Sequence, residues 1–177
     1  KGKTTFIYNG VKSKIDSTID ALDLSTINNL KTNYKILGSV AQLTQRKGLD
    51  QVINALPHLP GCAFVIVGDG KEKNNLETLA KTLSVENRVV FLGYKPNGAS
   101  YINHFDSFIM PSRSEGFGLS LMEAVACEKP IVCSDIESFK ELLSTDEATF
   151  FELENIKELQ SAITETLDKN YNKTSNA

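Results

Sequence analysis

The chain has 177 residues, which is enough for one domain with a single hydrophobic core. Hydrophobic residues make up 41% and charged residues 23%, and the formal net charge is -3, so we expect no nucleic acid as a partner. No apolar run approaches the roughly 20 residues of a membrane-spanning helix, and the first residues lack the apolar stretch of a signal peptide. We therefore interpret residues 1–177 as one domain of a cytoplasmic protein without a transmembrane segment.

Strand-like and helix-like segments alternate along most of the chain. A polar lead-in over residues 12–33 is expected to form a loop or short helices, and a polar tail over residues 170–177 is expected to be frayed. Between them, apolar side chains with helical spacing separate short β-rich runs. The expected strands are Thr5–Tyr8, Ile36–Ala41, Ala63–Val67, Arg88–Leu92, Ser107–Met110, Ile131–Cys133 and Ala148–Phe151.

The order of these segments predicts the fold class. Several of the expected strands are continuously apolar, as in strands that are covered on both faces. Repeated strand–helix units imply right-handed crossovers and a parallel sheet. The sequence therefore predicts an α/β protein with a Rossmann-like parallel sheet sandwiched by helices.

One stretch, PSRSEGFGLSLMEA at residues 111–124, places glycines at the start of an expected helix. The strand Ser107–Met110 ends just before it, and open parallel sheets bind ligands beyond the carboxyl ends of their strands. A helix start attracts anions through its N–H groups, and Gly116 and Gly118 let a ligand approach the backbone. The stretch therefore suits a phosphorylated ligand whose anion lies on the amides of Gly118–Leu121.

Two carboxylates, Glu115 and Glu123, flank this helix start. An ionised carboxylate only accepts hydrogen bonds, so hydroxyl groups are its natural partners. A phosphate cradle between two carboxylates fits a ligand with hydroxyls at both ends, such as a sugar–diphosphate–nucleoside. From spacing alone, the alternative stays open that Glu123 is a solvated helix residue and that Glu115 caps a turn.

The segment SEGFGLSLMEA resembles the E-x7-E motif of the glycosyl transferases group 1 family, also called family 4 of the nucleotide-sugar glycosyltransferases. The resemblance extends over Thr5–Leu167 and includes, in the family's order, IYNGV, GSVAQLTQRKGLDQVINAL, FVIVGDG, VVFLGY, FIMPSRSEGFG and ACEKPIVCSD. It implies the C-terminal, donor-binding half of a GT-B glycosyltransferase. The N-terminal acceptor domain of that architecture is absent from this sequence, so we expect the chain to bind nucleotide and to be inactive or nearly so alone.

The resemblance also implies roles at matching positions. Glu115 would contact hydroxyls of the donor sugar, Glu123 the nucleotide ribose and Lys47 the diphosphate, with Glu115 and Lys47 as the catalytic residues. The other expected substrate-binding residues are Gly93 and Tyr94 beside the base, and Gly116, Phe117, Gly118, Leu119 and Ser120 near the sugar and diphosphate. Transfer would occur with retention at the anomeric carbon, and fixed positive groups would stabilise the departing diphosphate.

One position departs from the family pattern. Gln42 stands where many members have arginine, and glutamine offers a phosphate only neutral donors. Arg46, next to Lys47, either supplies the missing charge or points into solvent. The sequence contains no DxD motif, so we expect no metal and no cofactor, and the nucleotide-sugar is a substrate.

Three function classes stay open. The first is a glycosyltransferase of the hexosyltransferase type that uses a nucleotide-diphosphate sugar, UDP-sugar being the commonest donor of the family. Such enzymes build surface polysaccharides or glycolipids, and any peripheral membrane contact would involve the missing half. The second is a noncatalytic nucleotide-binding or interaction module of the same fold, which Gln42 makes conceivable. The third is a Rossmann-type oxidoreductase. The segment VGDG argues against this class, because it lacks the third glycine of the dinucleotide-binding motif.

Overall fold

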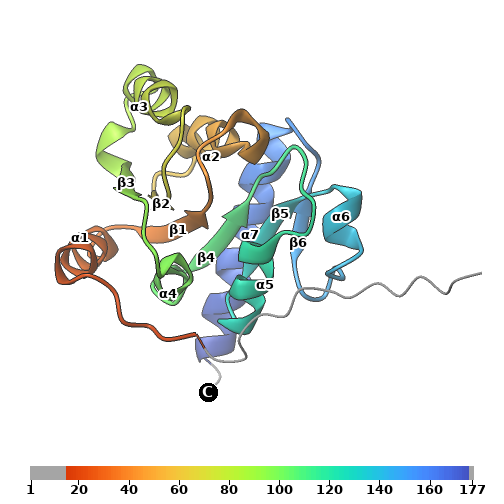
Figure 1. The fold of residues 1–177 in the computed structure, drawn as a ribbon. Coiled ribbons are helices and arrows are strands. Elements are labelled where there is room, and N and C mark those ends of the chain that lie inside the picture. The colour runs from red at the N-terminus through yellow and green to blue at the C-terminus, as the bar shows by residue number, and fades with distance from the viewer. Residues whose placement is uncertain (1–14, 176–177) are drawn as a thin grey trace, which may run out of the picture.

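A six-stranded parallel sheet forms the centre of the computed structural model, which describes residues 15–175 (Figure 1). The strand order is β3-β2-β1-β4-β5-β6, and every neighbouring pair is parallel. This doubly wound order reverses between β1 and β4, which is its topological switch point. The strands are β1 (Lys35–Val40), β2 (Cys62–Val67), β3 (Val89–Gly93), β4 (Ser107–Met110), β5 (Ile131–Ser134) and β6 (Thr149–Phe151).

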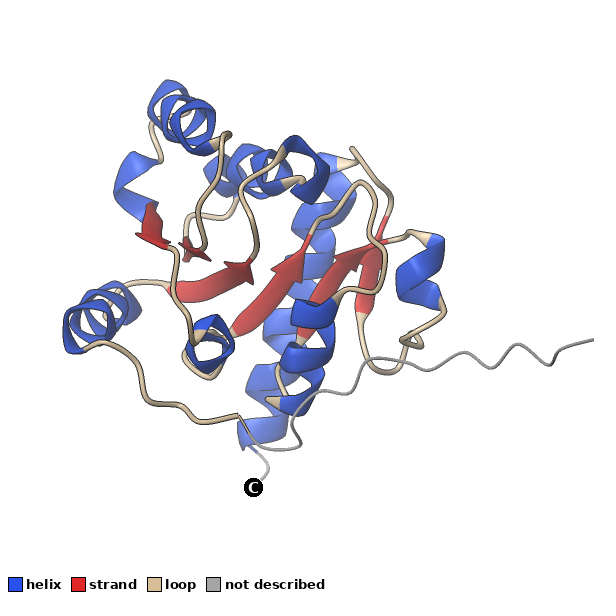
Figure 2. Ribbon diagram, viewed as in Figure 1, coloured by secondary structure: helices blue, strands red, loops and turns tan. Residues whose placement is uncertain are grey.

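Helices cover both faces of the sheet, as Figure 2 shows. On one face lie α1 (Ala21–Lys31), α4 (Gly98–Ile102), α5 (Leu119–Ala126) and α6 (Glu137–Lys140). On the other face lie α2 (Leu49–Ala55), α3 (Lys73–Thr82) and α7 (Ile156–Ser175). The predicted Rossmann-like sandwich is confirmed. None of the described helices is long and apolar enough to cross a membrane.

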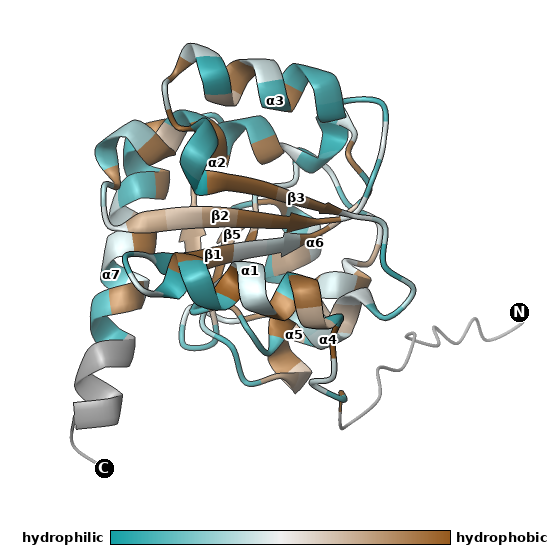
Figure 3. Cartoon of the chain, turned by 90° about the vertical axis from the view of Figure 1, so that its left-hand side faces the viewer, coloured by the Kyte–Doolittle hydropathy of each residue, from teal (hydrophilic) through white to brown (hydrophobic). Residues whose placement is uncertain are grey.

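The strands carry apolar side chains on both faces, because each face packs against helices. In β1, Leu37 belongs to the cluster under α2 and α7, while Ile36 packs with Ile27 of α1. All six residues of β2 are buried, and Figure 3 shows β2 and β3 as apolar strands between helices with polar outer surfaces. Burying one large apolar side chain contributes about 1.5–3 kcal/mol, so this sheet is the rigid base from which the loops project.

The observed elements match the expected ones in the sheet and differ near the ends of the chain. Each described strand lies within one residue of its expected bounds, and the expected strand Thr5–Tyr8 lies outside the described residues. The lead-in contains a full helix, α1, in place of a loop or short helices. Asp20 caps it by accepting the amide of Leu22 at 2.9 Å, which fixes where it begins.

At the other end, helix α7 continues through Ser175 and so extends into the polar tail, residues 170–177. That this tail is frayed stays a prediction. The short helices α4 and α6 were not expected. They are only five and four residues long, and so short a segment carries too little periodicity to be recognised.

Gly38 in β1 gives a test of the sheet packing. A Cβ at this position would lie 2.0 Å from the ring of Phe105, which is 2% exposed. We expect Gly38→Ala to lower the free energy of unfolding by about 1–3 kcal/mol, because the ring has to move inside a packed core. Urea denaturation of the chain measures this. The matched control is Gly61→Ala, where a Cβ would meet nothing within 4 Å, and equal stability of the two variants would contradict the packing.

Candidate functional site

The loops that follow β1 and β4 meet at the carboxyl edge of the sheet. The two strands are neighbours, with Leu37 opposite Ser107 in the register, so the loops at their ends are neighbours too. The β1 loop, residues 41–48, contains the 3-10 turn Gln45–Lys47 and leads into α2. The β4 loop, residues 111–118, leads into α5. The two loops therefore lie at the topological switch point, where open parallel sheets bind ligands.

An ion pair joins the two loops. The Lys47 ammonium donates a hydrogen bond to Oε2 of Glu115, and the two side chains are only 12% and 10% exposed. Nη1 of Arg46 donates to Oε1 of Glu115 at 3.1 Å and to the Ser114 carbonyl at 2.9 Å. The structure thus brings together three residues that the sequence singled out. Arg46, with a side chain that is 48% exposed, contacts the site and does not simply point into solvent.

The charge state of Glu115 follows from these neighbours. Burial alone would raise the pKa of its carboxyl, but the hydrogen bonds and charges of Lys47 and Arg46 outweigh burial and lower the pKa below its ordinary value. Glu115 is therefore ionised at neutral pH. Its Oε1 also accepts a hydrogen bond from the Gly116 amide at 3.3 Å. Glu115 therefore caps the turn, as the alternative interpretation expects, and forms the ion pair as well.

Glycines shape the two loops for different reasons. Gly48 has φ 64, and a Cβ there would lie 2.0 Å from the Pro111 carbonyl oxygen, so the β1 loop packs directly on the β4 loop. Gly118 has φ 71 and precedes the first residue of α5. Gly116 differs, because a Cβ there would meet nothing within 4 Å and its φ is not positive. The fold does not require glycine at this position, and the space beside its backbone is open.

The start of α5 is slightly different from the expected anion cradle. Gly118 provides no side-chain cap, and the Leu121 amide already donates to the Gly118 carbonyl at 2.9 Å. The Leu121 amide is therefore not available to an anion, and the cradle expected over Gly118–Leu121 is shorter by this one amide. The amides of the first helical turn, up to Ser120, precede the intrahelical hydrogen bonds and are the donors that an anion could use.

A cavity of about 440 Å³ lies next to these loops, at the carboxyl ends of β1, β2 and β3 and beside α5. It contains two predicted residues, Tyr94, which is 74% exposed, and Ser120. Gln42, the departure from the family pattern, also lines it. The full lining is Val40, Ala41, Gln42, Val67, Gly68, Asp69, Tyr94, Lys95 and Ser120.

Glu123 is not among the residues that line this cavity. It lies on α5, is half-buried, and forms no hydrogen bond or ion pair with any side chain of the described region. Burial raises the pKa of its carboxyl. The structure therefore joins Glu115 with Lys47 but does not by itself join Glu123 with them. A half-buried carboxyl without a partner differs from the solvated helix residue of the alternative interpretation.

The remaining predicted residues lie on the same edge of the sheet. Gly93 has φ 74 and its carbonyl accepts the Gly68 amide at 2.8 Å, so it also has a structural role. Phe117 is half-buried in the β4 loop, and Leu119 is 50% exposed at the start of α5. Within residues 15–175, no three His, Cys, Asp or Glu side chains are grouped so that they could hold a metal ion.

The VGDG segment is a turn at the end of β2. A Cβ at Gly68 would lie 1.9 Å from the Ala41 carbonyl oxygen, and one at Gly70 would lie 2.3 Å from that of Leu43. Both glycines are therefore needed for this turn to pack on the β1 loop. This supports the interpretation of VGDG as a strand-end turn and gives no dinucleotide fingerprint.

Sequence reasoning missed Arg113 and Gln51, two polar side chains next to the ion pair. Arg113 bonds to Asp50 and Glu154, which lie 63 and 41 positions away. Gln51 bonds to Pro111 and to Glu154, 60 and 103 positions away. Arg113 lies inside the recognised motif, but contacts over such separations leave no local pattern in a sequence.

Comparison with known proteins shows the family of this chain. The family model for Glycosyl transferases group 1 matches residues 21–177. The chain belongs to this family. The O-antigen biosynthesis glycosyltransferase WclY of Escherichia coli is 34% identical over 172 residues, which are 92% of this chain and 46% of WclY. The chain thus spans about half the length of that curated relative.

Solved structures of GT-B glycosyltransferases share the fold of this group 1 chain. Anabaena HepE in complex with UDP matches with a TM-score of 0.75 and 25% identity, covering 86% of this chain and 44% of HepE. HepE in complex with UDP and glucose matches with a TM-score of 0.73 and 25% identity, covering 83% of this chain and 43% of that one.

The two glutamates should respond to pH with opposite signs. The pKa of Glu115 is lowered in the folded state, so its ionised form stabilises the fold above the ordinary value of 4.5, and this contribution is lost as the pH falls. The pKa of Glu123 is raised, so its carboxylate costs stability once the pH rises through the folded value. At neutral pH we expect Glu115→Gln to lower the melting temperature and Glu123→Gln to leave it equal or raise it.

Thermal unfolding followed by circular dichroism between about pH 4 and pH 7 measures this. The differences from the wild type should shrink for both variants toward the acidic end. A Glu115→Gln variant as stable as the wild type at neutral pH would contradict the ion pair. A Glu123→Gln variant less stable than the wild type would contradict the unpaired state of Glu123.

Proposed function

We propose that this chain is the donor-binding, C-terminal half of a retaining GT-B glycosyltransferase of family 4, and that it binds a nucleotide-diphosphate sugar. The observation that carries the proposal is the Lys47–Glu115 pair at the switch point of the sheet, next to the start of α5. The Lys47 ammonium and the start of α5 suit the diphosphate of such a ligand, and the Glu115 carboxylate suits the hydroxyls of its sugar. Membership of the group 1 family supports the reaction class.

Each part of the ligand has a group that suits it. The diphosphate would lie on Lys47 and on the first-turn amides of α5, where the open space beside Gly116 admits it. Glu115 would then accept hydrogen bonds from the donor sugar. The base would occupy the cavity of about 440 Å³ beside Tyr94. The ribose would lie at the rim of this cavity and donate to Glu123, which is three residues after Ser120 on α5. HepE has been solved with UDP and with UDP and glucose, which supports a uridine nucleotide here.

The proposed chemistry is electrostatic. The bond between the sugar's anomeric carbon and the diphosphate oxygen breaks, and its electron pair stays on the diphosphate. An acceptor oxygen forms the new bond on the same face of that carbon, and the acceptor hydroxyl passes its proton to the departing diphosphate. Lys47 and the start of α5 are positive groups fixed where the new negative charge develops, so they stabilise the transition state without reorganisation. Glu115 orients the sugar through its hydroxyls.

A complete enzyme would need an N-terminal acceptor-binding half, and this chain covers 46% of WclY. That relative's role in O-antigen biosynthesis supports a surface polysaccharide or glycolipid as the product. A reaction without metal or cofactor, and a cytoplasmic location, stay predictions. The competing proposal is a noncatalytic nucleotide-binding module, and the observation behind it is the neutral Gln42 in the cavity lining.

Isothermal titration of the chain with UDP, GDP, ADP and NAD tests the proposed ligand. We expect UDP to bind, and we expect Glu123→Ala to weaken UDP binding roughly ten- to a hundred-fold, because a hydrogen bond to a charged group is lost. The matched control is Glu86→Ala, an exposed glutamate at the start of the 3-10 turn before β3. Binding of NAD without any nucleoside diphosphate would instead indicate an oxidoreductase.

A second measurement separates the catalytic from the noncatalytic proposal. The chain joined to its acceptor half should release UDP from the donor sugar in the presence of acceptor, while the chain alone should be inactive or nearly so. Equal turnover by both would contradict the division into halves. Nucleotide binding with no turnover in the longer protein would favour the noncatalytic module.

A further inference from the structure

Arg113 ties the β4 loop to the β1 loop. Its backbone N–H donates to the Arg46 carbonyl at 2.8 Å, and its Nη1 donates to the Gln45 carbonyl at 2.7 Å. Lys47 directly follows Arg46 in the β1 loop, and Glu115 lies two residues after Arg113 in the β4 loop. The bonds of Arg113 therefore set the spacing between the ammonium and the carboxylate of the ion pair.

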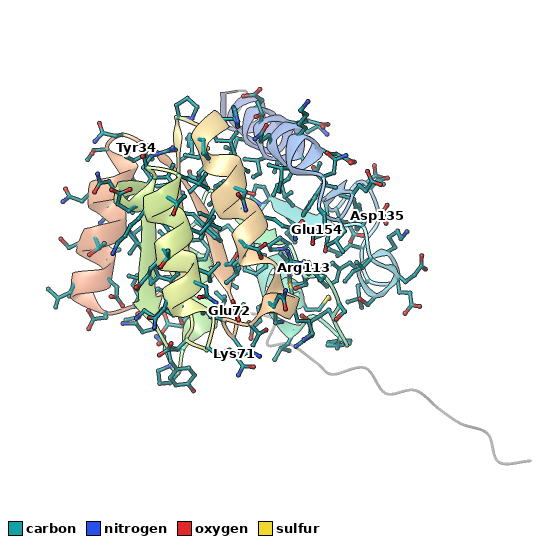
Figure 4. All side chains as sticks on the ribbon, turned by 90° about the horizontal axis from the view of Figure 1, so that it is seen from above. Tyr34, Lys71, Glu72, Arg113, Asp135 and Glu154 are labelled. Carbon is teal, nitrogen blue, oxygen red and sulfur yellow. The ribbon has the colours of Figure 1, made fainter. Side chains whose placement is uncertain are left out.

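Two carboxylates from other elements hold the Arg113 guanidinium. Asp50, in the first turn of α2, accepts from Nη1 at 2.9 Å and from Nη2 at 2.7 Å. Glu154, in the turn before α7, accepts from Nε at 2.6 Å and from Nη2 at 3.3 Å. Figure 4 shows Arg113 and Glu154 side by side. A planar guanidinium can make such paired bonds and a lysine ammonium cannot.

Every donor of the Arg113 side chain is occupied. A guanidinium has five N–H groups, and the structure assigns each of them an acceptor on Gln45, Asp50 or Glu154. None is left for a substrate. The side chain is 25% exposed, and both of its carboxylate partners raise its pKa above the ordinary value, so it stays charged.

Gln51 also links the β4 loop to Glu154. It is 1% exposed, and its side chain donates to the Pro111 carbonyl at 2.9 Å and accepts the Glu154 amide at 2.9 Å. Glu154 has φ 64, a left-handed conformation that costs energy for a residue other than glycine. Such a conformation persists where surrounding contacts over-determine it, and Arg113 and Gln51 supply those contacts.

We propose that Arg113 is a positioning residue of the donor site. With Asp50 and Glu154 it forms a brace that holds the β1 and β4 loops in register, so that Lys47 meets the diphosphate while Glu115 meets the sugar. The brace acts through Lys47 and Glu115 and touches no part of the ligand. This inference rests on the proposed function, and its test separates the two.

A double-mutant cycle with UDP as the probe tests the brace. We expect Arg113→Lys to weaken UDP binding about tenfold, the effect of losing roughly one charge-assisted hydrogen bond at Lys47. In a Lys47→Met background the same change should have little further effect, because the group that Arg113 positions is gone. Affinity for uridine, which has no phosphate, should not change. Equal losses in both backgrounds, or an equal loss for uridine, would overturn the proposal.

Arg88→Lys is the matched control. Arg88 is also a partly buried arginine, and it donates to the carbonyls of Leu56, Leu59 and Cys62 at 2.8–2.9 Å, away from the carboxyl edge of the sheet. We expect this variant to lower the melting temperature and to keep the wild-type affinity for UDP. A loss of UDP affinity equal to that of Arg113→Lys would show a general effect of destabilisation and overturn the brace.

A measurement without ligand keeps the two proposals apart. In Arg113→Lys, amide hydrogen exchange over residues 45–48 and 111–118 should be faster than in Arg88→Lys, and unchanged exchange would overturn the brace. If Arg113→Lys does not fold, Asp50→Asn removes the charge of one partner and takes its place. A wild-type chain that binds no nucleoside diphosphate would contradict the proposed function, whereas an additive cycle in a chain that binds UDP would contradict only the brace.

Discussion

The ion pair between Lys47 and Glu115 is the contact on which the organisation of this edge depends. It joins loops 68 positions apart in the sequence, across the point where the strand order of the sheet reverses. Both side chains are largely withdrawn from water, so each charge needs the other. Removing Glu115 would leave the Lys47 ammonium as an uncompensated, largely buried charge, whereas Glu115 would keep Arg46 as a partner if Lys47 were removed. The sheet therefore presents a lysine whose position is fixed before any ligand arrives.

The same pair explains how a carboxylate can lie beside the proposed diphosphate site. In the free protein Glu115 neutralises Lys47 and receives a second cation, Arg46. In the proposed complex the diphosphate replaces Glu115 as the partner of Lys47, and the carboxylate turns to hydroxyl groups of the sugar. Because Lys47 and Arg46 lower its pKa, Glu115 is ionised at neutral pH and can accept those hydrogen bonds. One ionic contact is exchanged for another.

The sequence predicted the framework well because strands buried on both faces leave continuous apolar runs, as in Cys62–Val67. Glu115 could be placed at the carboxyl edge because it follows a strand of a parallel sheet, and Lys47 was assigned to the same site by the family resemblance. Their mutual contact, and the bonds of Arg113 to Asp50 and Glu154, could not be predicted, since hydrogen bonds between distant loops leave no periodic signal. Glu123 was expected to bind the ribose of the same ligand, and among the described residues its carboxyl has no partner.

A crystal structure of this chain with UDP tests the central claim most directly. The account predicts phosphate oxygens within hydrogen-bond distance of the Lys47 ammonium, with the ion pair to Glu115 opened and the ribose hydroxyls on Glu123. A nucleotide bound elsewhere on the chain, with Lys47 still paired to Glu115 and free of phosphate, would contradict it.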